Sequence, residues 1–358
     1  MKKKLLSILL TGVVLYLFAA FAYSEESALE NAGIKIVIDG KSSAYENVPI
    51  IVGDRTLLPF REILLNLGVQ DDEQHIIWND AERSVTVYED SVKIFLKIGS
   101  NTAYINDAPV QIDVAPVIYK NRSYIPARFI SQSMGKKVSW YEKTNTVAIC
   151  DPDSFDKVNG VILKSDAAME SVKFKSTFDM NMELGGILKS AVTFEEEQDP
   201  GKKLEHSVMR NDENGAQTVT ETYRTEGAVY EKEGSNGKWI KTDPGEVKDG
   251  ENLDLSVGEL LNMSAGLVFK ENAGPGEIVL EGDIGFINLF DAKNDPDYKV
   301  HTIMVIDEEG YFIREVSFKM SGTAVVNSTK FPYIIEASCK FYDYGGDFSI
   351  ELPEDLPD

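Results

Sequence analysis

One stretch of this chain occurs twice: it reads Pro49-Ile-Ile-Val-Gly-Asp-Arg55-Thr-Leu-Leu-Pro59-Phe-Arg61 and later Pro116-Val-Ile-Tyr-Lys-Asn-Arg122-Ser-Tyr-Ile-Pro126-Ala-Arg128. Each copy continues with a glycine and then a tryptophan. The residues that the two copies share are Arg55, Pro59, Arg61, Gly68 and Trp78 in the first, and Arg122, Pro126, Arg128, Gly135 and Trp140 in the second. Two copies of one supersecondary unit indicate a packed scaffold rather than a catalytic centre.

Both copies predict a ββαββ unit. In the first copy, short apolar runs on either side of the turn residues 53–55 indicate a tight hairpin. Pro59 and Pro126 suit the first turn of a helix, where no backbone N–H is needed, and Gly68 and Gly135 suit its end in the left-handed conformation. The tryptophan then lies on a third strand, which a turn joins to a fourth. We expect a domain of two such repeats over residues 34–150.

The repeated arginines and tryptophans allow two interpretations. Arg61 and Arg128 lie in the first helical turn, where a cation opposes the helix dipole. Either they contact an anion or a glycan, or they bond to a nearby carboxylate or to loop carbonyls and fix the hairpin against the helix. Their recurrence beside the proline and glycine favours the structural role. Trp78 and Trp140 pose the same choice between core packing and stacking on a sugar ring.

The repeated Arg-[Thr/Ser]-x-[Leu/Ile]-Pro-x-Arg, the helix ending in glycine and the tryptophan strand make residues 34–150 resemble the copper amine oxidase N-terminal-like domain, a stalk module of exported bacterial proteins. The resemblance implies a scaffold, because in the oxidases copper is held elsewhere by three histidines, beside a cofactor made from the tyrosine of an Asn-Tyr motif. This chain has no Asn-Tyr pair, and beyond residue 150 its histidines are His206 and His301. We therefore expect no catalytic residues, no metal and no cofactor.

Residues 154–358 predict a second domain. An amphipathic helix starts near Ser154, and residues 174–184 then alternate apolar with polar side chains, as in a strand with one dry face. Further strands follow at hairpin spacing, interrupted by a helical stretch near residues 257–269. The expected fold class is α+β, with an antiparallel sheet of seven to nine strands and a few covering helices.

This second domain resembles the half-barrel of bacterial lipoprotein carriers and related envelope lipoproteins. The resemblance is carried by the methionine-rich strand, the hairpin between Tyr230 and Trp239, and the closing segment 348–353. It implies a groove for an acyl chain, since methionine and phenylalanine adapt to irregular apolar ligands. The residues expected to line it are Phe178, Met180, Met182, Phe318 and Met320. The alternative is that these five side chains are ordinary core.

Charge and cysteine content limit the partners. The formal net charge of −23 repels phosphate backbones, so no nucleic acid is expected. Cys150 and Cys339 either form a disulfide or are two buried free thiols, and the second is favoured. The acidic segment 291–297 is expected to be a solvated turn rather than a calcium loop, because it lacks the spaced ligands and glycine.

The N-terminus predicts export. Basic residues 2–4 precede the uncharged run 5–22, which ends in Ala20-Phe-Ala22, so residues 1–22 have the pattern of a cleaved signal peptide. An uncleaved membrane anchor is the alternative. The chain is thus predicted to be a non-enzymatic envelope protein, secreted or at the cell surface, with a stalk domain and a domain that binds lipid or another apolar ligand. The competing hypothesis is a structural protein that binds a cell-wall or envelope partner and no small molecule.

Cleavage after Ala22 would leave a mature protein that begins at Tyr23. N-terminal sequencing of the protein from the cells that produce it checks this directly. Recovery of Met1 from the membrane fraction would support the uncleaved anchor instead.

Overall fold

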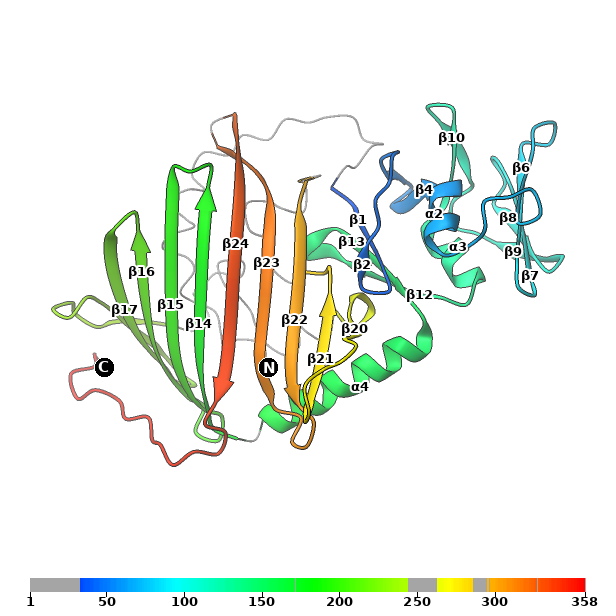
Figure 1. The fold of residues 1–358 in the computed structure, drawn as a ribbon. Helices are drawn as coiled ribbons and strands as arrows, with labels where there is room; N and C mark the ends of the chain where they lie inside the picture. The colour runs from blue at the N-terminus through cyan, green and yellow to red at the C-terminus, as the bar shows by residue number, and fades with distance from the viewer. Residues whose placement is uncertain are drawn as a thin grey trace.

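The computed structural model describes residues 33–170, 172–243, 263–285, 295, 297–326 and 328–357. The predicted leader, and most of the acidic segment 291–297, lie outside the described residues. An N-terminal domain lies beside one edge of a large curved sheet (Figure 1). Within the described residues, no helix combines the length and the apolar character needed to cross a bilayer.

The N-terminal domain contains the predicted order ββαββ twice. The first copy consists of β3 (Ile50–Val52), β4 (Arg55–Pro59), α2 (Phe60–Asn66), β5 (Ile76–Asn79) and β6 (Ser84–Glu89). The second consists of β10 (Val117–Tyr119), β11 (Arg122–Pro126), α3 (Ala127–Ser133), β12 (Lys137–Tyr141) and β13 (Thr146–Cys150). The remaining strands are β1 (Lys35–Ile38), β2 (Lys41–Ser42), β7 (Val92–Lys97), β8 (Thr102–Ile105) and β9 (Ala108–Gln111).

The two copies join through their equivalent strands. β4 pairs antiparallel with β11, so that Leu58 faces Ile125 at the centre of a sheet ordered β10-β11-β4-β3. The second hairpins diverge, because β5 and β6 join β7 to β9 while β12 and β13 join β1 and β2. Leu58, Ile63, Ile125 and Ile130 are nevertheless fully buried in one core. The repeat therefore builds a single domain from two similar but not identical halves.

Both helices end at the predicted glycines. Gly68 and Gly135 have φ of +95° and +74°, in the left-handed region that side chains avoid. The Gly68 N–H donates to the Leu65 carbonyl, and the Gly135 N–H donates to the Gln132 carbonyl. No atom lies within 4 Å of a Cβ built on either glycine. A side chain there would be strained by the backbone conformation and not by crowding.

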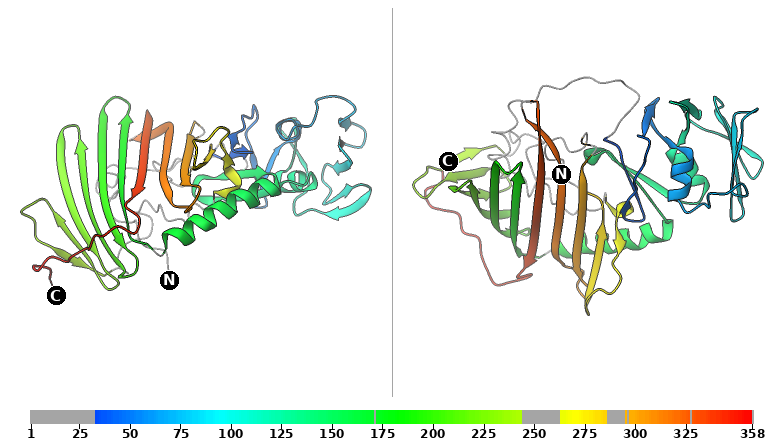
Figure 2. Two further views of the ribbon diagram at one scale, coloured as in Figure 1. Left: turned by 60° about the horizontal axis from the view of Figure 1, so that its bottom comes forward. Right: turned by 45° about the horizontal axis from the view of Figure 1, so that its top comes forward.

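The C-terminal domain starts with α4 (Pro152–Met169), two residues earlier than expected, because Pro152 suits the first helical turn. The strands that follow form one sheet. They are β14 (Phe174–Leu184), β15 (Leu188–Asp199), β16 (Leu204–Glu213), β17 (Ala216–Arg224), β18 (Val229–Glu233), β19 (Ile240–Thr242), β20 (Val268–Phe269), β21 (Glu277–Gly282), β22 (Lys299–Asp307), β23 (Ile313–Val326) and β24 (Thr329–Tyr342). Their order is β19-β18-β17-β16-β15-β14-β24-β23-β22-β21-β20, and the sheet curves into a half-barrel (Figure 2).

Three expectations need correction. The sheet has 11 strands rather than seven to nine, and the described structure is mostly β with few helices, so the label α+β fits only in part. The missed strands include β15 and β16, whose charged residues lie on both faces and hide the alternation. The helical stretch expected up to residue 269 is instead a 3-10 turn, η2 (Ser264–Gly266), and the strand β20; residues 257–262 lie outside the described part.

The two domains meet along a packed seam. The Asp283 N–H donates to the Gly40 carbonyl at 2.8 Å, and the Asp283 carboxylate accepts from the Ser42 N–H at 2.9 Å. The Ala265 N–H donates to the Tyr141 hydroxyl at 3.2 Å. Cys150, at the end of β13, belongs to the core of the curved sheet. Like Cys339 it is a buried free thiol, the alternative that the sequence favoured.

Replacing Gly68 or Gly135 by valine is expected to destabilise the protein by about 1–2 kcal/mol or more, because a β-branched residue is forced into the left-handed region. Thermal unfolding of the full-length variants measures the effect. Gly160→Ala is the control: Gly160 lies inside α4 with open space around it, so alanine there is expected to stabilise by roughly 0.5–1 kcal/mol. Unchanged unfolding of both valine variants would contradict the role of the repeat glycines.

Candidate functional site: the inner face of the curved sheet

The curved sheet has two chemically different faces. Along β14, Phe178, Met180 and Met182 are buried while Asp179 and Asn181 are exposed, as the alternation predicted. We call the face that carries Met180 the inner face and the face that carries Asn181 the outer face. The apolar side of α4 belongs to the same core as the inner face. The inner face is therefore the side on which a ligand could be held away from water.

The structure brings the five predicted lining residues together on the inner face. We call a row of residues that are paired across adjacent strands a rung. The five residues lie on three adjacent rungs of β14, β24 and β23, and each is exposed by 5% or less. The rungs are Phe178–Cys339–Val316, Met180–Ala337–Phe318 and Met182–Ile335–Met320. We call these nine residues the apolar zone. At its centre the small Ala337 separates the long side chains of Met180 and Phe318, which leaves the apolar surface uneven.

The same face becomes polar on the two rungs that follow the Phe178 rung, across the strands from β14 to β18. One rung crosses five strands as Ser176–Glu196–Ser207–Thr222–Glu231, and the next contains Gln198–Glu205–Arg224. We call these eight residues the polar zone. Glu196, Glu205, Thr222 and Arg224 are all buried. This zone was not predicted from the sequence, although the acidic run 195–197 was a signal, since at least one of three successive strand residues must face inward.

Two carboxyl groups lie side by side in the polar zone. Glu196 accepts hydrogen bonds from the Ser176 hydroxyl at 2.9 Å and from the Gln198 amide at 2.7 Å. Burial raises the pKa of Glu196 to about 7, although these hydrogen bonds and the Arg224 charge oppose the rise. Burial and the neighbouring Glu196 also raise the pKa of Glu205. The pair therefore retains protons at pH values where exposed glutamates are ionised.

Several buried polar atoms of the polar zone are not satisfied. The Arg224 Nε lies 3.5 Å from the Glu205 Oε2, close enough for an ion pair, but neither atom has a hydrogen-bond partner. The Thr222 hydroxyl also has none. Buried polar atoms in proteins are almost always hydrogen-bonded, and each exception costs roughly 1–3 kcal/mol. A cluster of such exceptions on one face is an unusual feature for a plain structural core.

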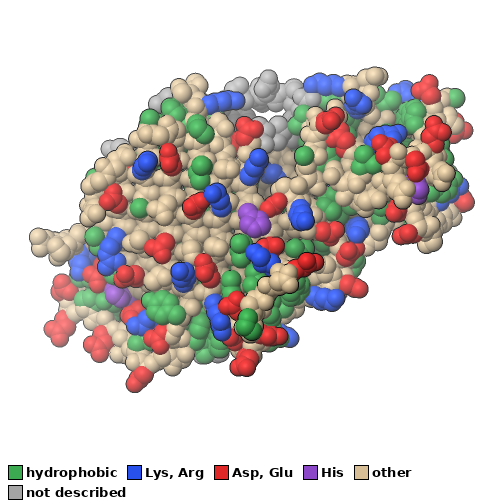
Figure 3. All heavy atoms as spheres, in the orientation of Figure 1, with side chains coloured by type: hydrophobic (Ala, Val, Ile, Leu, Met, Phe, Trp, Pro, Cys, Tyr) green, Lys and Arg blue, Asp and Glu red, His purple; other side chains and the backbone are tan. Residues whose placement is uncertain are grey.

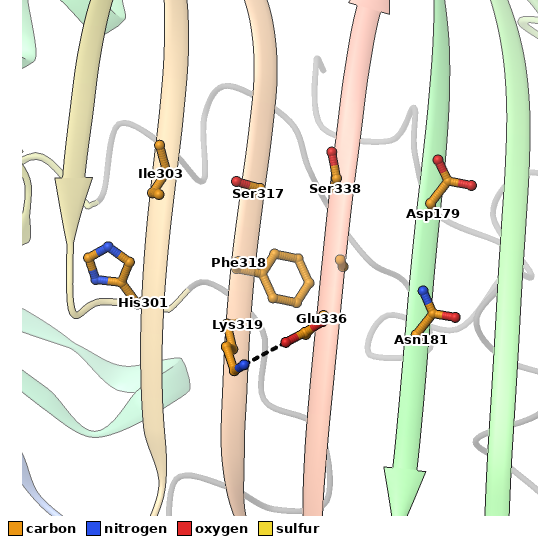
Figure 4. A pocket seen from close by; sticks show the side chains of 10 residues that line it. Asp179, Asn181, His301, Ile303, Ser317, Phe318, Lys319, Glu336 and Ser338 are labelled. Carbon is orange, nitrogen blue, oxygen red and sulfur yellow. Dashed lines mark hydrogen bonds and ion pairs between the residues drawn. The ribbon is translucent and has the colours of Figure 1, made fainter. Parts of the chain in front are cut away.

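The outer face has the character of an ordinary solvated surface. Acidic and basic side chains are interspersed over it (Figure 3). A shallow depression of about 310 Å³ is lined by Asn181, His301 and Lys319 among others, and its side chains stand apart on four strands (Figure 4). Lys319 pairs with Glu336 at 2.5 Å, and His301 contacts Asp283 at 2.8 Å. In the described part of the chain no three His, Cys, Asp or Glu side chains are grouped to hold a metal ion.

The repeat residues of the N-terminal domain differ between the two copies. In the first, Arg55 pairs with Asp113 at 3.0 Å, and Arg61 pairs with Asp71. The Trp78 ring stacks on Phe60, with centroids 6.3 Å apart. In the second copy the equivalent residues Arg122, Arg128 and Trp140 are all exposed. Pro59 and Pro126, by contrast, are buried in both copies.

A comparison with curated proteins found no match. Among solved structures, the chain is similar to LprF from Mycobacterium bovis, at 13% identity and a TM-score of 0.30, over 55% of this chain and 97% of that one. It is similar to a DUF1329 family protein from Desulfovibrio piger, at 9% identity and a TM-score of 0.23, over 55% and 95% of the two chains. It is also similar to a LolA superfamily protein from Nitrosomonas europaea, at 10% identity and a TM-score of 0.21, over 55% and 95%.

The family model that matches the chain falls on the repeat domain. It is described as the copper amine oxidase N-terminal domain, and it covers residues 37–149. The match ends within a residue of the predicted domain end at 150 and begins three residues after the predicted start at 34. The resemblance drawn from the repeated arginine, proline and glycine residues is thereby confirmed: residues 37–149 match the copper amine oxidase N-terminal domain.

Proposed function

We propose that this protein is exported to the cell envelope and acts there by binding, without catalysis. Its C-terminal half-barrel holds a lipid or another apolar ligand on the inner face of the sheet, and its N-terminal domain is the scaffold that positions the half-barrel. The observation that carries the proposal is the contiguity of the apolar zone with buried polar groups that lack hydrogen-bond partners.

The apolar zone suits a ligand of irregular shape. Met180, Met182 and Met320 have unbranched side chains that adjust to different apolar surfaces. Cys339 and Ala337, on two of the three rungs, are small, so β24 presents little side-chain bulk at that end of the zone. A hydrocarbon chain lying across these rungs would replace the contacts that small residues do not make.

The polar zone explains why a ligand is a better account than a core alone. A core has no need of a buried Arg224 and two buried glutamates, since replacing buried ion pairs by apolar residues is often neutral or stabilising. Buried charged residues that lower the stability of a protein, and are nevertheless retained, are typical of binding sites. A ligand with both an apolar and a polar part would contact both zones at once.

The scaffold role leaves a second surface for partners. Trp140, Arg122 and Arg128 are exposed on the second repeat, where the first repeat uses the equivalent residues for internal contacts. An exposed tryptophan and arginine suit a cell-wall glycan or an envelope protein. This is the observation that favours the alternative hypothesis of an interaction protein without a small ligand.

Met180→Trp and Phe318→Trp test the ligand proposal. If the apolar zone holds a ligand, these substitutions fill its site, so that binding of fatty-acid or phospholipid probes weakens while the unfolding temperature changes little. If the zone is close-packed core, the larger rings overpack it and destabilise the protein by roughly 1–3 kcal/mol. Asn181→Trp is the matched control, because the same ring is added to the same strand on the outer face.

Native mass spectrometry of the purified full-length protein completes this experiment. A retained endogenous lipid that is lost from the inner-face variants, but not from Asn181→Trp, supports the proposal. Absence of lipid, together with a large loss of stability in both inner-face variants, would leave the structural and interaction role as the better account.

A further inference from the structure

The polar zone contains more acidic than basic groups. Glu196, Glu205 and Glu231 lie on neighbouring rungs of β15, β16 and β18, and Arg224 is the one cation within these rungs. Glu233 lies on the rung beyond, and the Cys339 thiol approaches Glu196 from the side of β24. Arg224 pairs with Glu205. Among the described residues, neither Glu196 nor Glu231 has a cation within ion-pair distance.

An excess of buried carboxyl groups is tolerable only while they keep their protons. Moving a carboxylate out of water without a counter-ion is so costly that the group takes up a proton instead. The raised pKa values of Glu196, Glu205 and Glu231 follow from this, with burial as the largest cause in each. A bound cation would supply the missing counter-charge.

Two of the three unpartnered atoms in the polar zone point to the type of cation, and the third, the Arg224 Nε, lies against Glu205. Thr222 is exposed by 2%, lies between Ser207 and Glu231 on its rung, and has a hydroxyl without a hydrogen-bond partner. The Glu205 Oε2 is a second acceptor that accepts no hydrogen bond. Free acceptors beside carboxyl groups suit a head with several N–H donors, as an ammonium group has. An anionic head such as phosphate would instead face the carboxylates.

We propose that the polar zone binds the ammonium head of a cationic amphiphile whose apolar body lies on the apolar zone. This inference rests on the proposed function, since it names the class of ligand that the inner face takes. The head donates to Glu205, Thr222 and Glu231, and its charge lies beside the neighbouring carboxyl groups of Glu196 and Glu205, which lose a proton. The net charge of −23 also attracts a cationic ligand from solution.

Binding of such a head displaces protons. Glu–COOH and R–NH₃⁺ become Glu–COO⁻ paired with R–NH₃⁺, and the carboxyl proton passes to solvent. An alkylammonium, with a pKa near that of lysine at about 10.4, stays charged throughout the range in which the carboxyls titrate. Affinity therefore rises with pH across the interval around 7, by at most about tenfold per pH unit for each proton released.

Isothermal titration of the full-length protein with decylammonium, 1-decanol and decanoate tests the inference. The three probes share one chain length and differ in the charge of the head. Decylammonium is expected to bind at least about tenfold more tightly than the other two at pH 7.5, and to lose this advantage at pH 5.5. Heats measured in two buffers of different ionisation enthalpy are expected to show proton release for decylammonium alone.

Glu196→Gln and Glu231→Gln are expected to remove the preference for decylammonium while decanol binding remains. Glu195→Gln is the matched control, because Glu195 precedes Glu196 on β15 and is exposed on the outer face. Glu231 is only partly buried, so its variant is expected to fold even if Glu196→Gln does not. Equal binding of all three probes would overturn the ammonium inference and leave the proposed function standing. Binding of none of them would overturn both.

Discussion

The pairing of β14 with β24 is the interaction on which the rest of the structure depends. It joins the first and the last strand of the curved sheet in an unbroken register from Lys175 opposite Tyr342 to Leu184 opposite Tyr333. All other strands of the sheet extend outward from this central pair. Because side chains alternate between faces, a slip of one residue would turn Met180 and its neighbours to the solvent. The rungs of the apolar zone are therefore defined by one long-range contact.

The two zones lie on neighbouring rungs of the sheet. The apolar rungs continue past β14 to Val192 of β15 and Met209 of β16, whereas the next rungs carry carboxyl, hydroxyl and guanidinium groups. Burial of the apolar zone stabilises the fold, whereas desolvation of the buried polar and charged groups in the polar zone costs stability. A chain selected for stability alone would have little reason to keep both. Their contiguity is the feature on which the proposed ligand depends.

Local signals in the sequence predicted the elements whose chemistry is simple. The strict alternation of residues 174–184 gave β14 its exact ends, and the glycines at 68 and 135 marked the helix ends. Where a strand is charged on both faces, as at Glu195, Glu196 and Glu197, the alternation is lost and β15 was missed. The ion pair within the polar zone could not be foreseen, because Arg224 meets Glu205 only through the register of two strands. Nor could the different exposure of Trp78 and Trp140, since repeated residues lose equivalence once their second hairpins enter different sheets.

The short junction between the two domains has a mechanical consequence. β13 ends at Cys150 and α4 begins at Pro152, so Asp151 is the whole connection. The seam at Gly40 is tight as well, since a Cβ there would lie 3.0 Å from Val268. The two domains are thus joined without a flexible linker. Movement of the N-terminal domain is therefore transmitted to the β20–β21 edge of the half-barrel through these contacts.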